Sequence, residues 1–146
     1  MKLVVQRVLN AQVDVDGKTV GKIDKGFMVL CGITHEDTEK EADILARKLC
    51  NLRVFEDENE KMNLSLKDVD GKLLIISQFT LYADSMSSGN RPSFIAAARP
   101  EKAEPIYLEL LKNLREEIKT ESGAFRTYME IEMVADGPGT YIYEEF

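Results

Sequence analysis

The chain has 146 residues, with 26 acidic and 19 basic side chains, a net charge of −7, one histidine and two cysteines. This length and ordinary composition predict a single soluble domain over residues 1–146, and the scarce cysteine and histidine argue against a structural zinc site. The sequence shows no signal peptide and no apolar run long enough to span a membrane, which predicts a cytoplasmic protein, and its acidic charge argues against binding long duplex nucleic acid while permitting contact with a short single-stranded end.

Strand patterns dominate the start of the chain. An apolar run at residues 2–9 passes into alternating apolar and polar residues over 11–16, the period of two expected of a half-buried strand. Asp16-Gly17 predicts a turn, residues 18–23 a returning hairpin strand, and residues 27–33 a buried strand that is apolar in both phases. We therefore expect four strands before any helix.

The first helix is predicted over residues 38–51. Thr38 followed by Glu41 forms a capping box, in which each side chain pairs with the other residue's backbone. Apolar side chains then recur on one stripe of this helix at Ala42, Leu45, Ala46, Leu49 and Cys50. After a turn at Asp70-Gly71, residues 72–82 are expected to form a long central strand, because the first half of this segment is apolar on both sides.

The remaining elements complete a mixed pattern. Residues 84–90 are mostly polar and small and include a glycine, which predicts a mobile surface loop. A second amphipathic helix is expected over 102–121, followed by strands at 128–133 and 140–145. Two helices and about seven strands, several of them joined by hairpins, favour an α+β fold with a mostly antiparallel, barrel-like or layered sheet.

Polar residues interrupt the expected central strand at Ser77-Gln78-Phe79-Thr80-Leu81. The period of a strand places Gln78 and Thr80 on one face and Ser77 and Phe79 on the other. One interpretation is a pocket at the end of the strand, where a hydroxyl and an amide meet a ligand, since buried polar groups need partners. The other is a strand that emerges into solvent, and these residues alone favour it.

A second signal is the segment Asp136-Gly137-Pro138-Gly139-Thr140. Proline followed by glycine suits a type II turn, so the segment alone predicts a hairpin turn. The sequence does not choose between a cis and a trans Gly137–Pro138 bond.

Other reactive side chains are weaker candidates. His35 is expected at the surface, whereas Cys31 and Cys50 are expected in the core as small apolar residues. No Ser-His-Asp set can be assembled without forcing the single histidine into it.

The whole chain resembles the D-aminoacyl-tRNA deacylases, a family first described for D-tyrosyl-tRNA. The resemblance is carried by VVQRV at 4–8, ADILARKLCNLRVFEDENEKMNLSL at 42–66, SQFTLYAD at 77–84, RPSF at 91–94 and DGPGT at 136–140. The joint occurrence of SQFTL and the late Gly-Pro pair, at this spacing in a chain of this length, is highly specific.

The resemblance implies a homodimer with a three-layer β/β/α fold, in which barrel-like, mostly antiparallel sheets pack with two main helices. It implies hydrolysis of the ester that joins a D-amino acid to the terminal adenosine at the CCA end of tRNA, with rejection of L-aminoacyl-tRNA. Glycyl-tRNA is a further candidate substrate, and no metal or organic cofactor is implied. In the family, the SQxxL strand of one subunit lines the pocket, and a Gly-Pro pair with a cis bond reaches in from the other.

Carried onto this chain, the resemblance implies a set of site residues. The catalytic or positioning groups are Ser77, Gln78 and Thr80, and the substrate-binding residues are Phe79, Leu81, Gly137, Pro138, Thr140 and Arg7. We expect the ribose 2′-hydroxyl of the terminal adenosine to assist the reaction, because no base is visible beside Thr80 to activate it. Backbone N–H groups near Phe79 and Thr80 are candidate oxyanion donors, and Arg91 and Lys112 are further candidates for tRNA contacts.

This sequence also departs from the family's usual pattern. Ala135 and Gly139 stand where the usual turn has Asn and Val, residues 125–129 are bulkier than usual, and the 84–90 loop lacks the usual basic residues. Two alternatives therefore stay open. The chain could be a non-catalytic module that binds tRNA ends or a protein, or a relative with relaxed chirality that removes a small L-amino acid from tRNA.

Overall fold

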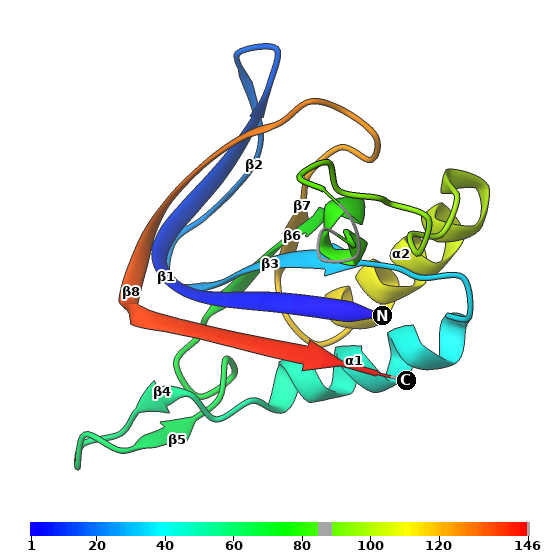
Figure 1. Cartoon of the computed structure of the whole chain (residues 1–146). Helices are drawn as coiled ribbons and strands as arrows, with labels where there is room; N and C mark the ends of the chain where they lie inside the picture. The colour runs from blue at the N-terminus through cyan, green and yellow to red at the C-terminus, as the bar shows by residue number, and fades with distance from the viewer. Residues whose placement is uncertain (85–88, 146) are drawn as a thin grey trace.

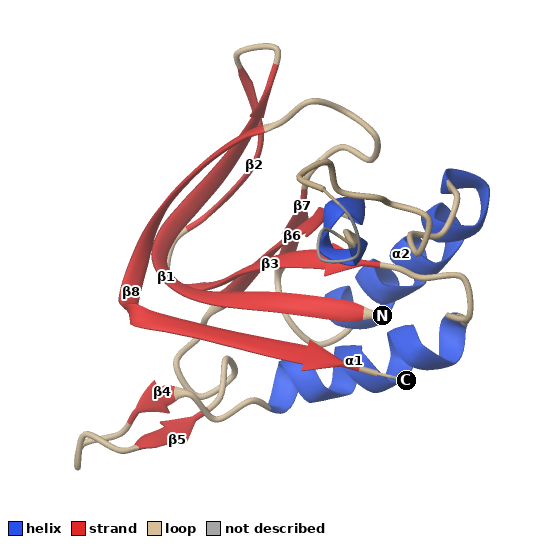
Figure 2. Cartoon of the chain, in the orientation of Figure 1, coloured by secondary structure: helices blue, strands red, loops and turns tan. Residues whose placement is uncertain are grey.

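The described residues form a curved sheet with two α-helices packed against one face (Figure 1 and Figure 2). The computed structural model describes residues 1–84 and 89–145. The helices are α1 (Glu39–Asn51) and α2 (Pro100–Arg115), and a short 3₁₀ helix, η1, spans Phe79–Tyr82. The strands are β1 (Lys2–Val15), β2 (Lys18–Ile23), β3 (Gly26–Gly32), β4 (Phe55–Glu56), β5 (Met62–Leu64), β6 (Lys72–Ser77), β7 (Thr120–Ser122) and β8 (Glu130–Glu144).

Residues 2–15 form the single strand β1, so the prediction of four strands before the first helix was wrong and three precede it. Strand β1 organises the main sheet, whose order is β2-β1-β3-β6-β7 with β8 also paired to β1. Residues 2–8 of β1 pair with β3 and residues 11–15 pair with β2, while β8 follows β1 from Lys2 to Asp14, all antiparallel. Only the β3–β6 and β6–β7 pairs of this sheet are parallel among the described residues. The predicted α+β fold with a barrel-like, mostly antiparallel sheet is therefore confirmed.

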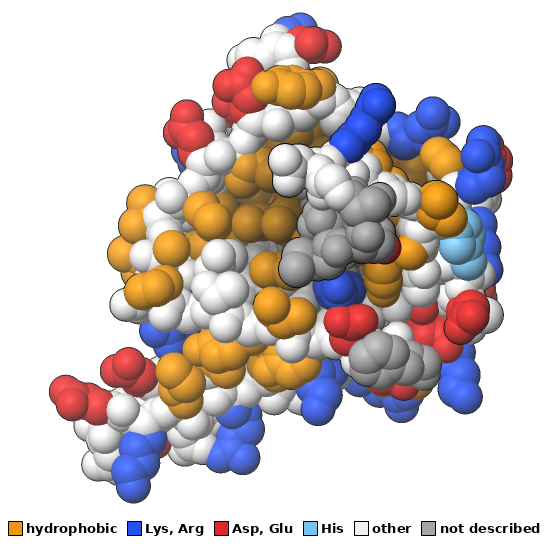
Figure 3. All heavy atoms as spheres, viewed as in Figure 1, with side chains coloured by type: hydrophobic (Ala, Val, Ile, Leu, Met, Phe, Trp, Pro, Cys, Tyr) orange, Lys and Arg blue, Asp and Glu red, His pale blue; other side chains and the backbone are white. Residues whose placement is uncertain are grey.

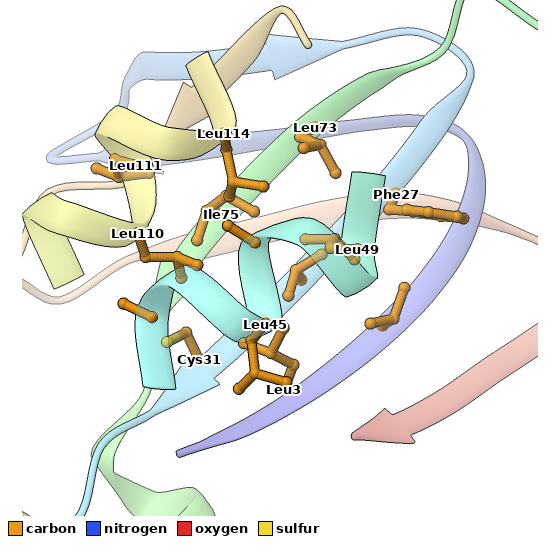
Figure 4. Close-up of a cluster of buried hydrophobic side chains, with 14 of the residues drawn as sticks. Leu3, Phe27, Cys31, Leu45, Leu49, Leu73, Ile75, Leu110, Leu111 and Leu114 are labelled. Carbon is orange, nitrogen blue, oxygen red and sulfur yellow. The ribbon is translucent and has the colours of Figure 1, made fainter. Parts of the chain in front are cut away.

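Buried side chains form two clusters, one on each face of the main sheet. The larger cluster lies between the sheet and the helices, where Leu45 and Leu49 of α1 and Leu110 and Leu114 of α2 surround Ile75 of β6 (Figure 4). The smaller cluster lies on the opposite face of the sheet and consists of Val8, Ala11, Val13, Ile23, Met28, Leu74 and Ile76. Strand β6 contributes to both clusters, which explains why its sequence is apolar on both sides.

Helix α1 begins as the capping box predicts. The Glu41 carboxylate accepts a hydrogen bond from the Thr38 N–H at 2.7 Å, and the Thr38 hydroxyl accepts one from the Lys40 N–H at 3.2 Å. The Thr38 hydroxyl also donates to this carboxylate, and this bond together with that from the Thr38 N–H holds the pKa of Glu41 below its ordinary value. The helix predicted over 38–51 is confirmed.

Strand β6 ends at Ser77, so the prediction of a strand over 72–82 was wrong beyond that residue. The Gln78 N–H still donates to the Cys31 carbonyl at 2.8 Å, but the chain then turns into η1, where the Leu81 N–H donates to the Gln78 carbonyl at 3.4 Å. The period of two fails here because the backbone closes a local turn and leaves the sheet.

Helix α2 begins at Pro100 and ends at Arg115, whereas the pattern predicted 102–121. Proline suits the first helical turn, because its missing N–H would have no partner there. At the other end, residues 120–122 leave the helix and pair in parallel with β6 as strand β7. Pairing with the sheet therefore overrides the apolar spacing that Ile118 continues.

Strand β8 is continuous, so the two strands and the hairpin turn predicted for this part of the chain were wrong. Its register pairs Gln6 with Thr140 and Val8 with Ala135, which leaves residues 136–139 bulging out of the strand. The Gly-Pro pair lies in this bulge and links no two antiparallel strands.

The two chain ends lie close together (Figure 1). The Met1 ammonium pairs with the Asp37 carboxylate at 2.7 Å and donates to the Glu145 carbonyl at 3.2 Å.

Of the loop predicted at 84–90, residues 85–88 lie outside the described residues. No described helix is both long and apolar enough to cross a membrane.

Candidate active site

A hollow of about 660 Å³ opens where β6 ends, and Ser77, Gln78 and Phe79 line it. Its other walls come from β3, the segment before α2, the first turn of α2 and the loop before β8. These walls include Cys31, Ile33, Ile76, Phe94, Ala97, Ala98, Arg99, Glu101, Ala103, Phe125, Arg126, Thr127, Tyr128, Met129 and Ile131. Figure 3 shows hydrophobic side chains covering the hollowed part of one face, with Lys and Arg side chains to its upper right.

The polar groups at the end of β6 are available to a ligand. Ser77 and Gln78 are half-buried, and neither side chain has a hydrogen-bond partner among the described residues. The backbone N–H groups of Phe79 and Thr80 likewise donate to no described acceptor, as expected at the start of a helical turn. The segment in which the apolar strand pattern gives way to polar residues therefore contains hydroxyl, amide and N–H groups that have no described hydrogen-bond partner.

Aromatic rings frame the hollow on two sides. Phe79 is 56% exposed and meets Phe94 edge to face, with ring centroids 5.1 Å apart. Phe125 packs on Tyr107 of α2 with centroids 5.8 Å apart. Sequence reasoning did not assign a role to either Phe94 or Phe125, although Phe94 lies in the RPSF stretch that carries the family resemblance.

Two residues of the SQFTL segment lie outside the lining of the hollow. Thr80 is exposed on η1, and Leu81 is half-buried behind it, where its carbonyl accepts from the Lys2 ammonium at 3.3 Å. The exposed side chains of Arg91 and Lys112 do not line the hollow either. Their roles in substrate binding or catalysis stay predictions.

The second group of predicted site residues lies around the bulge in β8. Arg7 is only 6% exposed, and its Nη1 donates to the Val54 carbonyl at 2.5 Å. Its Nε donates to the Asp136 carbonyl at 3.3 Å and pairs with the Asp136 carboxylate at 3.4 Å. The buried guanidinium therefore ties the bulge to the body of the fold, and the Gly137–Pro138 bond is cis, as the resemblance implies.

Glycine is required at one position of this bulge and accommodated at another. Gly137 has a φ of +119°, and a Cβ there would lie 2.9 Å from Arg7 Nη2, so a side chain would displace the turn. Gly139 is buried, and a Cβ there would lie 3.1 Å from the Tyr141 hydroxyl. The Tyr141 side chain therefore fills part of the space beside Gly139.

The bulge presents its other residues to solvent. Gly137 and Pro138 are exposed, and the Thr140 hydroxyl donates to the Gln6 side chain at 2.7 Å. None of these residues lines the hollow at the end of β6. The structure thus gathers Ser77, Gln78 and Phe79 in one place and the Gly-Pro bulge in another.

The described lining of the hollow contains one cysteine and no histidine. Burial raises the pKa of the Cys31 thiol to about 12, which keeps it protonated. The exposed His35 does not line the hollow, and its Nε2 lies 2.5 Å from the Ile95 carbonyl. Charged side chains enter the lining only at its rim, as Arg99, Glu101 and Arg126. Across residues 1–84 and 89–145, no group of three or more His, Cys, Asp or Glu side chains is arranged to hold a metal ion.

Residues 4–144 match the family described as D-Tyr-tRNA(Tyr) deacylase. A D-aminoacyl-tRNA deacylase of Fusobacterium nucleatum is 55% identical over 145 residues, covering 99% of this chain and 95% of the relative. A D-aminoacyl-tRNA deacylase of Brevibacillus brevis is 52% identical and covers 99% of both chains.

Solved structures share the fold of this chain. A structure described as c-Myc DNA Unwinding Element Binding Protein superposes with a TM-score of 0.91 at 42% identity, covering 99% of both chains. A probable eukaryotic D-amino acid tRNA deacylase shares the fold with a TM-score of 0.82 at 16% identity, covering 97% of both chains. With its SQFTL hollow and its Gly-Pro bulge, this chain belongs to the D-Tyr-tRNA(Tyr) deacylase family.

Proposed function

We propose that this protein hydrolyses the ester bond of D-aminoacyl-tRNA and releases free tRNA and a D-amino acid. The observation that carries the proposal is the hollow at the end of β6, where the Ser77 hydroxyl and the Gln78 amide have no described partner. This hollow belongs to a chain that is 55% identical to a D-aminoacyl-tRNA deacylase over nearly its full length.

The reaction needs positioning and charge stabilisation, because an aminoacyl ester is already activated. Water attacks the ester carbonyl carbon while the ribose 2′-hydroxyl of the terminal adenosine relays the proton from the water to the leaving 3′-oxygen. The tetrahedral oxyanion accepts hydrogen bonds from the N–H groups of Phe79 and Thr80. Ser77 and Gln78 hold the ester in place, and the described lining of the hollow contains no histidine.

We further propose that a second copy of the chain completes the site. The hollow and the Gly-Pro bulge lie apart within one chain, so the bulge of one subunit would enter the hollow of its partner. Apolar side chains that are exposed along β1 and β8 support such pairing, namely Leu9, Ile131, Met133, Val134 and Ile142. Exposed apolar surface, where it is extensive, marks an interface between proteins.

In this arrangement chirality is selected by exclusion. The backbone carbonyls of Gly137 and Pro138 would lie beside the substrate α-carbon, where they leave room for hydrogen but clash with an L side chain. Arg7 serves as a positioning residue, since its buried guanidinium holds the bulge through Asp136. Thr140 anchors the far side of the bulge through Gln6.

The whole chain forms one catalytic domain in this proposal. The family match over residues 4–144 and the pairing of β1 with β8 along nearly their full length support it. We place the enzyme in the cytoplasm, where aminoacyl-tRNA is used in translation. Binding to the CCA end is expected to be weak and salt-sensitive, because the protein and tRNA are both acidic.

One comparison favours a second candidate, a nucleic-acid-binding role without turnover. The solved structure at 42% identity carries a DNA-binding description. The net charge of −7 argues against this candidate for duplex DNA, because phosphate contacts need clustered Lys and Arg.

Side-by-side hydrolysis of D-tyrosyl-tRNA and L-tyrosyl-tRNA at catalytic enzyme concentration tests the function. The D ester is expected to disappear rapidly and the L ester to persist. Gln78→Ala is expected to slow the reaction by about tenfold or more, whereas Gln12→Ala, a change on β1 beside Asp14, keeps the parent rate. Loss of neither ester would contradict the deacylase, and equal loss of both would contradict L rejection.

A further inference from the structure

The loop that leads into β8 is fixed in place beside the hollow. The Gly123 N–H donates to the Ile75 carbonyl at 3.0 Å, and the Thr127 hydroxyl donates to the Ala124 carbonyl at 2.8 Å. The Phe125 ring packs on α2. The backbone that carries the residues after Phe125 is therefore held beside the hollow.

Arg126 occupies a backbone conformation that L side chains rarely adopt. Its φ is +60°, in the left-handed region where glycine is favoured. Residues kept in such conformations cluster at functional sites. Among the described non-glycine residues with a positive φ, Arg126 is the one that lines the hollow.

The Arg126 guanidinium is free to bind an anion. The residue is exposed, and no described residue forms a hydrogen bond or ion pair with it. Arg99 lines the same hollow immediately before α2, and its side chain is 80% exposed with one carboxylate contact, to Glu101 at 3.6 Å. Two arginines against one glutamate make this rim cationic in a chain whose net charge is −7.

Tyr128 adds an aromatic surface to the same rim. It lines the hollow and is 85% exposed, so one or both faces of its ring are accessible. Exposed aromatic rings stack on bases of single-stranded nucleic acid, and guanidinium groups bind the phosphates between them. The rim thus combines the two kinds of group that bind an unpaired strand.

We propose that Arg126, Arg99 and Tyr128 bind the nucleotides that precede the esterified adenosine, with the arginines on their phosphates and the tyrosine on a base. This inference rests on the proposed deacylase function, which requires an unpaired tRNA 3′ end at the hollow. The acidic protein would then have a local phosphate-binding site beside the hollow, which would attract the tRNA at the place where the ester must enter.

The test compares a substrate that has the nucleotides before the terminal adenosine with one that lacks them. D-tyrosyl-tRNA carries the whole 3′ end, whereas 3′-O-(D-tyrosyl)adenosine carries the ester and the adenosine without any phosphate. Arg126→Gly suits the positive φ and is expected to keep the fold. With this variant, KM for D-tyrosyl-tRNA is expected to rise about three- to tenfold while hydrolysis of the adenosine ester is unchanged.

Salt dependence counts the phosphate contacts. The slope of log KM against log salt for D-tyrosyl-tRNA is expected to fall by about 0.7 in Arg126→Gly and by about 1.4 when Arg99→Ala is added. Tyr128→Ala is expected to raise KM without changing the slope, because stacking releases no counterions. Arg47→Ala, in a separate groove between α1 and α2, is the matched control and should leave both values unchanged.

The possible failures are distinct. If KM and the salt slope are unchanged in Arg126→Gly, the proposed nucleotide binding by the rim is wrong, whereas the proposed deacylase function still stands. A proportional loss on both substrates would also overturn nucleotide binding by the rim, because the defect would then lie at the ester. If the parent protein cleaves neither substrate, the deacylase proposal is wrong, and so is the nucleotide-binding proposal that rests on it.

Discussion

Arg7 shows how a single side chain can serve the active site from the interior. Sequence comparison suggests a substrate-binding residue, but the guanidinium lies buried between the Val54 carbonyl and Asp136 of the bulge. Nothing in the local pattern of β1 predicts this, because both partners are far away in sequence.

Replacing this side chain should cost both stability and activity. Arg7→Met fills similar volume but leaves the buried Val54 carbonyl unpaired, so the free energy of unfolding is expected to fall by about 2 kcal/mol. Urea denaturation should show a lower midpoint at an unchanged slope. Release of Asp136 should lower the rate on D-tyrosyl-tRNA as well. A parent-like midpoint would contradict the structural role of Arg7.

Cys31 is expected to be chemically inert although it lines the hollow. Burial raises the pKa of its thiol to about 12, so almost no thiolate is present between pH 7 and 9. Native protein treated with iodoacetamide at pH 8 should keep its activity and an unmodified Cys31 by mass spectrometry. The urea-unfolded protein is the control and should be alkylated. Rapid alkylation of the native protein would contradict the burial of this thiol.

Among the elements, α1 was predictable and β8 was not. The capping box and apolar stripe of α1 are local signals, and the structure keeps both. The bulge at residues 136–139 depends on the register of β8 against β1, which is a long-range property. The end of β6 was not predicted for a different reason, because the chain closes a local 3₁₀ turn after Gln78 that the strand pattern does not reveal.

The cap of α1 makes stability depend on pH in a defined direction. The Thr38 hydroxyl and N–H bonds lower the pKa of Glu41, so the folded state favours the ionised carboxylate. The resulting stabilisation is present above the ordinary pKa of 4.5 and is lost as the pH falls through the lowered value.

Thr38→Ala is therefore expected to destabilise the protein by about 1 kcal/mol at pH 7. The difference from the parent should shrink as the pH falls below the lowered pKa of Glu41. Thermal unfolding of both proteins at pH 7 and at acid pH measures it. A difference that stays constant or grows on acidification would contradict the pairing of Thr38 with Glu41.

For the whole molecule, the fold class was predictable from composition and pattern, whereas the division of the site was implied only by the family resemblance. The hollow at β6 and the bulge of β8 each carry a recognisable motif, and within one chain the bulge does not line the hollow. An exposed apolar strand beside the bulge then gives a physical reason for a second copy.

This surface can be tested by adding charge. Val134→Glu places a carboxylate on the exposed face of β8, where Val134 is 46% exposed, and is expected to convert a dimer to a monomer with a large loss of activity. Leu108→Glu on α2, where Leu108 is 53% exposed, is the matched control and should remain dimeric and active. Sedimentation velocity gives the mass. A parent protein that is monomeric and fully active would contradict the shared site.

The most direct measurement is the activity of a mixed dimer. Gln78→Ala removes a side chain from the hollow, and Gly137→Ala displaces the bulge against Arg7, so each variant alone should be nearly inactive on D-tyrosyl-tRNA. The two variants are co-expressed with different C-terminal tags and the mixed dimer is isolated. One of its two sites then combines an intact hollow with an intact bulge, and about half the parent rate is expected. A mixed dimer as inactive as the separate variants would contradict a site completed by the second subunit.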